Sequence, residues 1–310
     1  MKINTLEAQK LIKKFRKQGI PYFFTNKVAV GITWRYQALM LLKQRKIKLL
    51  AFLRFCLPFW RGDRSKLNML LEKQNFELMG DLKDITLEIT SGHLMRPAIS
   101  SAMGGYDLLY FYYQITMLDQ YKIDDYIKEG SIVIDAGANI GMFSVNASLR
   151  GATVYAFEPV SIIASALREN TESFRVEVIE QGLGAAPGEK NIYFSPDALG
   201  SSTIEGSGMA FPDGSSAQKI KITTIDDFVR ERGIRVDFIK MDVEGYEKEV
   251  LAGAKETIRK FHPTIVCSAY HHPEDKRAIP VLIDSIDNNY VGSLLSRGED
   301  DFVFTAKGKV

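Results

Sequence analysis

The chain of 310 residues has little cysteine and no long uninterrupted apolar run. Its two cysteines, Cys56 and Cys267, are far apart and lack the paired spacing of a zinc knuckle or a redox motif. Disulfides are therefore not expected, and a reducing cytoplasm is the simplest location. Residues 1–19 scatter their basic side chains among single apolar ones, so they lack the basic stretch and apolar block of a signal peptide.

The segment 41–60 is too short and too charged to be expected to span a membrane. Lys48 and Arg54 interrupt it, whereas a transmembrane helix needs about 20 mostly apolar residues. Its basic residues, with Phe59 and Trp60, fit a helix that lies on a membrane surface. The favoured alternative is a helix packed on the catalytic domain or on a second subunit, which would make the protein a homo-oligomer.

Acidic residues are scarce at the N-terminal end. Residues 1–61 contain 14 Lys and Arg and a single acid, Glu7, so this region carries +13 and the rest of the chain −11. Such a basic region indicates an anionic partner: a phospholipid surface, a charged glycan, nucleic acid or the chain's own acidic part. The expected location is cytoplasmic, with peripheral membrane association through residues 1–61 as an alternative.

From residue 131 onward, short β-branched or aromatic runs alternate with helix-length stretches, which is typical of a parallel sheet covered by helices. The pattern predicts strands at 131–136, 153–157, 175–179, 236–241 and 264–269, and an edge hairpin at 290–295 and 302–306. It predicts helices at 141–150, 161–173, 246–260 and 274–288.

Two further segments complete the expected organisation. The Gly/Ser-rich segment 200–216 is expected to be a flexible loop that covers the substrate. Residues 62–105 are expected to be a connecting helical region that loosens at 90–97. We therefore expect a helical, basic N-terminal region over residues 1–105 and a catalytic domain over residues 106–310.

A strand, an acid, a glycine-containing turn and a helix follow one another over residues 131–144. Gly137 lets the chain reverse, and Gly141 lets the backbone approach a ligand or a neighbouring strand. A dinucleotide-binding turn reads G-x-G-x-x-G, but Asn139 stands where the middle glycine would be. The carboxylate of Asp135 would repel a pyrophosphate and attract the cationic amino group of a methionine moiety.

A second acid, Glu158, ends the next expected strand about 20 residues later, where nucleoside-binding units place a ribose-binding acid. Two acids at successive strand ends, with no basic residue in the turn, fit S-adenosylmethionine better than NAD. The alternative is an α/β sheet whose loops use glycine only for turning.

These motifs resemble those of a known family. Segments 135–141, 157–159 and 239–247 are similar to the FkbM-type class I methyltransferases, and the resemblance covers roughly residues 106–308. It implies an α/β fold with a Rossmann-like seven-stranded sheet, S-adenosylmethionine as cofactor and transfer to an oxygen. It also implies the cofactor contacts. Asp135, Gly137, Asn139 and Gly141 would contact the methionine part, and Glu158 would contact the ribose. Gln181, Gly182 and Leu183 would border the adenine.

Catalytic residues are expected where the later strands end. Asp242 and Glu244 follow the fourth expected strand two positions apart, so they share one side of an extended chain. His271 and His272 follow the fifth strand and reach the same sheet edge. A histidine could remove the acceptor's proton while an acid orients it, or the carboxylates could hold a divalent metal ion. Otherwise the histidines belong to a polar loop, and Glu247 is expected only as a helix-start charge.

The leading hypothesis is S-adenosylmethionine-dependent O-methylation of a hydroxyl on a sugar, glycan, glycolipid or small natural product, a substrate class that the resemblance implies. A nucleic-acid methyltransferase is an alternative. Against it, the chain has no Asn-Pro-Pro-Tyr motif and no recognisable nucleic-acid-binding module. A third hypothesis is a non-enzymatic assembly protein with a cofactor fold, although acids at both strand ends argue for a functional cofactor site.

Overall fold

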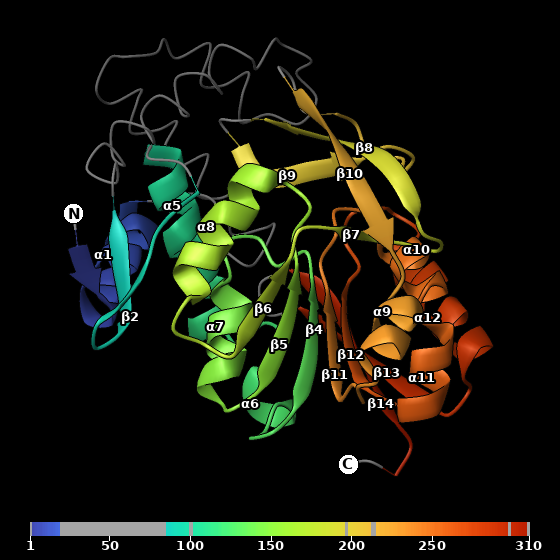
Figure 1. The fold of residues 1–310 in the computed structure, drawn as a ribbon. Helices are drawn as coiled ribbons and strands as arrows, with labels where there is room; N and C mark the ends of the chain where they lie inside the picture. The colour runs from blue at the N-terminus through green and yellow to red at the C-terminus, as the bar shows by residue number, and fades with distance from the viewer. Residues whose placement is uncertain are drawn as a thin grey trace, which may run out of the picture.

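The computed structural model describes residues 2–18, 85–98, 102–195, 198–211, 215–296 and 299–308. A seven-stranded sheet forms its centre (Figure 1). The strands, from one edge to the other, are β13 (Tyr290–Ser296), β14 (Asp300–Ala306), β12 (Thr264–Ser268), β11 (Phe238–Met241), β4 (Ile132–Ala136), β5 (Thr153–Phe157) and β6 (Val176–Ile179).

The sheet combines a parallel part with an antiparallel edge. Strands β6, β5, β4, β11 and β12 pair in parallel, whereas β14 runs antiparallel to both β12 and β13. Every residue of β11 and β12 is buried, as expected for parallel strands with helices on both faces. The structure thus confirms the expected α/β fold and its edge hairpin.

Helices cover the two faces of the sheet (Figure 1). One face is covered by α7 (Met142–Leu149) and α8 (Ser161–Thr171). The helices on the other face are α9 (Ile225–Arg232), α10 (Glu247–Ala252), α11 (Lys255–Phe261) and α12 (Asp275–Ile286).

The single helix expected over 246–260 is broken at Gly253. A Cβ atom at this position would lie 2.0 Å from the carbonyl oxygen of Gly184, so only glycine allows the two backbones to approach. The Gly253 carbonyl also accepts the backbone N–H of Asp226 at 2.9 Å. The prediction of one continuous helix was wrong because a distant segment of chain packs against its middle.

The expectation of a loop over 200–216 was also wrong in part. Its first residues belong to a strand, and a second strand begins at its end, within a four-stranded sheet that lies above the main sheet in Figure 1. The strands of this small sheet, in spatial order, are β7 (Gly182–Leu183), β10 (Ser216–Thr223), β8 (Gly188–Ser195) and β9 (Ala198–Ile204).

The described N-terminal part contains strands as well as helices, so the expectation of a helical region was wrong in part. A three-stranded sheet there is formed by β1 (Lys2–Asn4), β2 (Thr86–Thr90) and β3 (His93–Met95). Helix α1 (Thr5–Gln18) packs on it through the buried side chains of Ala8, Ile12 and Phe15. The segment 41–60, expected to be a packed helix or alternatively an interfacial one, lies outside the described residues.

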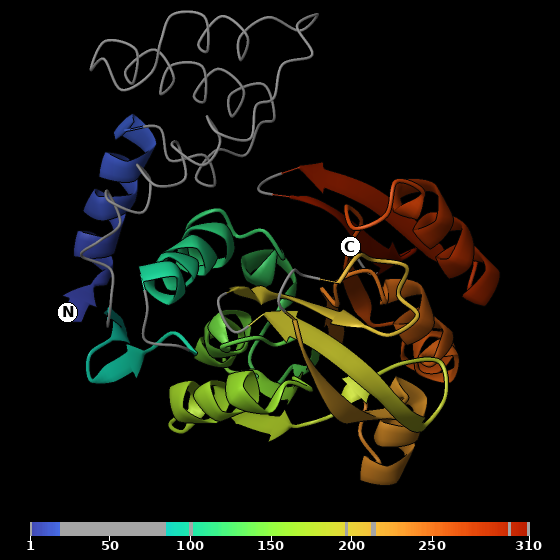
Figure 2. The same ribbon diagram turned by 90° about the horizontal axis from the view of Figure 1, so that it is seen from above.

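Three short helical segments lead from this part into the main sheet: α5 (Ala102–Phe111), the π-helical segment η3 (Tyr112–Met117) and α6 (Ile123–Tyr126). Seen from above, α1 and the hairpin β13–β14 lie at opposite sides of the molecule (Figure 2). Helix α5 runs through residue 105, where the domain boundary stays a prediction. Among the described helices, none is long and apolar enough to cross a membrane.

Candidate active site

A cavity of about 380 Å³ lies at the carboxyl ends of the parallel strands. This is where open α/β sheets bind ligands, and the volume is in the usual range for a small-molecule site of about 300–1,000 Å³. We call the lining residues that follow β4, β5 and β6 the cofactor half: 136–140, 157–159 and 181–183. The acceptor half is defined by other lining residues. These lie on α5 and η3, after β11 and after β12, and include Glu299.

The turn after β4 forms the floor of the cofactor half. Gly137 has φ +75°, and a Cβ atom there would lie 1.9 Å from the carbonyl oxygen of Asp242. Asn139 also has a positive φ of +50° and lines the cavity. Gly141 instead packs on α8, since its Cβ would lie 2.6 Å from Leu167. The structure therefore brings Gly137 and Asn139, but not Gly141, to the cavity wall.

Asp135 lies beneath this turn and does not line the cavity. Its carboxylate is fully buried, pairs with Lys240 Nζ at 3.1 Å and accepts the Ser144 hydroxyl at 2.6 Å. Lys240 Nζ also donates to the Gly137 carbonyl oxygen at 2.6 Å. Within this structure Asp135 holds the turn through Lys240, so the predicted direct contact with the methionine amino group has no support from its position.

Glu158 lies on the wall of the cofactor half with 5% of its surface exposed. Its carboxylate accepts the backbone N–H groups of Asn139 at 3.1 Å and Val160 at 3.0 Å. Burial raises the pKa of Glu158 to about 7, although these hydrogen bonds oppose the increase. Gln181, Gly182 and Leu183 line the same half.

These features fit S-adenosylmethionine. The backbone turn, the buried acid after β5 and the segment after β6 face one cavity, as the cofactor's methionine, ribose and adenine parts would require. The lining residues of the cofactor half include no basic side chain of the kind that binds pyrophosphate. The individual contacts remain predictions.

Asp242 is the central side chain of the acceptor half. Its carboxylate accepts hydrogen bonds from the Tyr121 hydroxyl at 2.7 Å and the Tyr270 hydroxyl at 3.1 Å. Burial alone would raise the pKa of Asp242, but nearby Lys240 and His271 and the two phenol hydrogen bonds outweigh it and lower the pKa. Asp242 is therefore a fixed, ionised hydrogen-bond acceptor.

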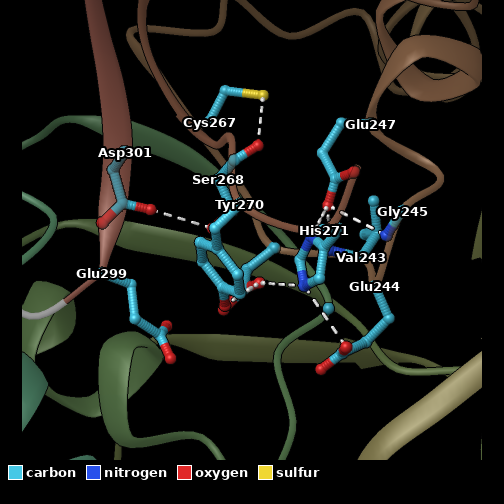
Figure 3. Close-up of polar contacts among 12 residues, drawn as sticks. Val243, Glu244, Gly245, Glu247, Cys267, Ser268, Tyr270, His271, Glu299 and Asp301 are labelled. Carbon is cyan, nitrogen blue, oxygen red and sulfur yellow. Dashed lines mark hydrogen bonds and ion pairs between the residues drawn. The ribbon is translucent and has the colours of Figure 1, made fainter. Parts of the chain in front are cut away.

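His271 lies between the carboxylates of Glu244 and Glu247 (Figure 3). Its Nε2 lies 3.2 Å from Glu244 and 3.7 Å from Asp242, and its Nδ1 lies 3.0 Å from Glu247. Burial disfavours the charged ring, but the carboxylates outweigh it and raise the pKa of His271 to about 11. His271 is thus a buried cation that holds the carboxylates in place, and in this state it cannot accept a proton.

Three of these residues could hold a metal ion. Ligand atoms of Asp242, Glu247 and His271 all lie within 4.8 Å of one another. However, the same Glu247 oxygen that faces His271 also accepts the backbone N–H of Val243 at 3.0 Å. Glu247, expected only as a helix-start charge, therefore belongs to the cluster around His271, and a divalent metal stays one of the two alternatives from the sequence.

His272 is not brought to the cavity. Its Nε2 lies 3.2 Å from the carbonyl oxygen of Gly245, and its backbone N–H donates to Asp275 at 2.8 Å. The two neighbouring histidines thus point to different partners, and only His271 joins the carboxylate cluster.

Glu299 is a candidate that the sequence patterns did not reveal. It lines the acceptor half and accepts a hydrogen bond from the Tyr110 hydroxyl at 3.3 Å. Burial, followed by the charge of Asp242, raises the pKa of Glu299 to about 7. Glu299 opens the acidic run 299–301 in the hairpin β13–β14, which reads in sequence as an ordinary solvated turn.

The seven-stranded sheet with its edge hairpin and the cavity over β4 and β11 is the arrangement of the class I methyltransferase fold. The profile described as the Methyltransferase FkbM domain matches residues 135–295, just over half of the chain. The protein therefore belongs to the FkbM methyltransferase family.

The chain is also similar in sequence to individual methyltransferases. The chain is 32% identical over 160 residues to the 31-O-demethyl-FK506 methyltransferase FkbM of Streptomyces tacrolimicus, covering 42% of this chain and 62% of that protein. It is 28% identical over 174 residues to the hexuronic acid methyltransferase AglP of Haloferax volcanii, covering 56% and 70%. The matched segment thus spans less than two thirds of the FkbM protein's length.

A solved structure was also found to be similar. The methyltransferase FkbM of Methylobacillus flagellatus KT superposes with a TM-score of 0.43 and 18% identity, over 77% of this chain and 60% of that one.

Proposed function

We propose that the protein transfers the methyl group of S-adenosylmethionine to a hydroxyl oxygen of a sugar, glycan, glycolipid or small natural product. The observation that carries this proposal is Glu299, a carboxylate on the cavity wall without an ion-pair partner among the described residues. It is placed to accept the proton that an alcohol must lose when its oxygen is methylated.

The chemistry asks two things of the chain. Bound S-adenosylmethionine supplies a methyl group on a positively charged sulfur, so the leaving group is already activated. The protein must align the hydroxyl, which is worth on the order of 7–11 kcal/mol, and remove its proton, which typically contributes about 10²–10⁴-fold. A base is most effective when its pKa is close to the working pH, and Glu299 has a pKa of about 7.

Asp242 suits the aligning role. Its lowered pKa makes it a weaker base than Glu299, while its two tyrosine partners fix its orientation. We expect a neighbouring donor group on the acceptor to bind Asp242 for orientation, while the reacting hydroxyl donates to Glu299 and loses its proton to it. Glu244, whose pKa burial raises, is a second carboxylate on the same wall.

The names of two relatives support transfer to oxygen on this kind of acceptor. One is named for 31-O-demethyl-FK506 as its acceptor, and the other for a hexuronic acid. The nucleic-acid alternative has no comparable support among the described residues that line the cavity.

The test is methyl transfer from labelled S-adenosylmethionine to a panel of hydroxyl-bearing sugars and natural products, with the product identified by mass spectrometry and NMR. We expect a methyl ether, formed by the wild type and strongly reduced in Glu299→Gln. Calorimetry with S-adenosylhomocysteine, with NAD as the control ligand, reports the cofactor site separately. An N-methylated product, or binding of neither ligand, would contradict the proposal.

A further inference from the structure

The acceptor half is rich in acidic side chains. Four carboxylates line it: Asp107 on α5, Asp242 and Glu244 after β11, and Glu299 before β14. Lys240 is the only basic residue among the described residues that line the cavity. Among the described residues, a ligand in this half therefore meets several carboxylates and at most one cationic side chain.

Lys240 is not available to a ligand anion. It is 4% exposed, and its ammonium group pairs with Asp135 at 3.1 Å and donates to the Gly137 carbonyl oxygen at 2.6 Å. The other nearby cation, His271, is held between Glu244 and Glu247 and does not line the cavity (Figure 3). Lys240 and His271 are thus both already paired with carboxylates of the protein itself.

Gln114 adds an independent sign of what the cavity binds. This residue is 4% exposed, lines the cavity, and has a side-chain oxygen without a hydrogen-bond partner in the described structure. Its Nε2 donates to the Tyr110 hydroxyl at 2.9 Å, and that hydroxyl donates in turn to Glu299. These two hydrogen bonds fix the orientation of the Gln114 amide. The side-chain oxygen of Gln114 is therefore left to accept a hydrogen bond from a ligand.

A buried hydrogen-bond acceptor that stays unpaired is unfavourable. The ligand that fits here is therefore one with hydrogen-bond donors. Aromatic rings, including those of Tyr106, Tyr110 and Phe111, line the same half and offer apolar faces to the C–H side of a sugar ring. Carboxylates and an amide oxygen that accept hydrogen bonds, together with aromatic rings, suit a polyhydroxylated ring.

We infer that the methylated hydroxyl belongs to a donor-rich acceptor that carries no anionic group near the reacting oxygen: an uncharged polyol or an amino sugar, and not a uronic acid or a phosphorylated sugar. This inference rests on the proposed function and narrows its substrate class. A carboxylate about 5 Å from one acid of the wall would weaken binding by a few hundred-fold, about 250-fold at an effective dielectric constant of about 20. The preference is therefore opposite to that expected of a hexuronic acid methyltransferase.

The test uses three matched hexoses, glucose, glucosamine and glucuronate, titrated into the full-length protein saturated with S-adenosylhomocysteine. We expect glucose and glucosamine to bind at least tenfold more tightly than glucuronate. A higher affinity for glucosamine than for glucose would indicate a contact with the ammonium group. Equal affinities for the two sugars would indicate that the acceptor is a neutral polyol. Equal or tighter binding of glucuronate, or no binding of either other sugar, would overturn the inference.

Two variants assign the preference to the cavity. Glu244→Gln removes one negative charge from the acceptor half and is expected to reduce the discrimination against glucuronate several-fold. Glu231→Gln removes one charge from the exposed surface of α9 and is expected to leave it unchanged. If both variants behave alike, the cavity charges do not set the preference.

Failure of the inference can be told apart from failure of the proposed function. A protein that binds S-adenosylhomocysteine and methylates glucuronate in preference to glucose would retain the proposed O-methyl transfer and lose only the inferred substrate class. Lack of S-adenosylhomocysteine binding, or methylation at nitrogen, would contradict the proposed function itself.

Discussion

The two halves of the cavity are built in different ways. The cofactor half is formed by consecutive residues and by backbone: a glycine turn, the residue after the next strand and a three-residue segment. The acceptor half is formed by side chains whose positions in the chain extend from Tyr106 to Glu299. Local sequence thus specifies the first half, whereas tertiary packing creates the second.

This difference predicts that backbone changes damage the cofactor half and side-chain changes damage the acceptor half. The largest effect is expected from Gly137→Ala. The new Cβ would lie 1.9 Å from the Asp242 carbonyl oxygen at φ +75°, so strain and overpacking should together cost about 2–5 kcal/mol. Calorimetry should show loss of S-adenosylhomocysteine binding, and a thermal melt should show a lower Tm.

Gly188→Ala is the matched control, because its Cβ would meet no atom within 4 Å. The idea that the turn tolerates no side chain would be abandoned if the two alanine variants had the same Tm and the same affinity.

The next largest effect is expected from Glu299→Gln, which tests the acceptor half alone. Loss of the proposed base should lower kcat by about 10²–10⁴-fold, with S-adenosylhomocysteine affinity unchanged. The control is Glu231→Gln, which should keep the wild-type kcat. A Glu299→Gln enzyme with wild-type kcat would show that another group takes the proton.

The pH dependence sharpens the same assignment. A carboxylate accepts a proton only when it is ionised, and the pKa of Glu299 is raised to about 7. The rate of the wild type should therefore increase as pH rises through about 7 and level off above it. In Glu299→Gln this increase should disappear; an identical profile in both proteins would argue against Glu299.

Glu158→Ala should have a moderate effect, confined to the cofactor half. Loss of a charge-assisted hydrogen bond to the ribose should weaken S-adenosylhomocysteine binding by about 1.5–3 kcal/mol. Calorimetric titration measures it, with binding to NAD as the negative control. Unchanged affinity would show that the ribose lies elsewhere.

Metal removal is expected to have little effect. The Glu247 oxygen near His271 already accepts the backbone N–H of Val243 at 3.0 Å, and Nδ1 of His271 lies 3.0 Å from it. Activity measured before and after dialysis against EDTA should agree. Loss of activity that Mg²⁺ or Mn²⁺ restores would instead assign a metal to Asp242, Glu247 and His271.

The smallest effect is expected far from the cavity, on the exposed face of α1. Lys10, Lys13 and Lys14 are exposed there, opposite the buried side of the helix, and we propose that they contribute to binding an anionic membrane surface. Replacing all three with glutamate should reduce co-sedimentation with phosphatidylserine vesicles and leave methyl transfer unchanged. Equal sedimentation of both proteins would remove the described part of the N-terminal region from this role.

The sequence predicted what depends on local pattern. The strands and the turn around Gly137 follow from hydrophobic runs and glycine positions, and the structure agrees with them. Glu299 could not be found in this way, because its importance comes from the approach of α5 to a hairpin far along the chain. The break at Gly253 was missed for a similar reason, since Gly184 packs against it from another part of the fold.

The close contact between Gly137 and the backbone of Asp242 makes the two halves share one wall. No side chain larger than hydrogen fits at position 137 unless the end of β11 moves, and Asp242 moves with it. Attempts to engineer a new acceptor specificity by reshaping the chain after β11 will therefore also disturb the cofactor turn. Changes confined to α5 or to the hairpin before β14 avoid that wall and are the better starting points.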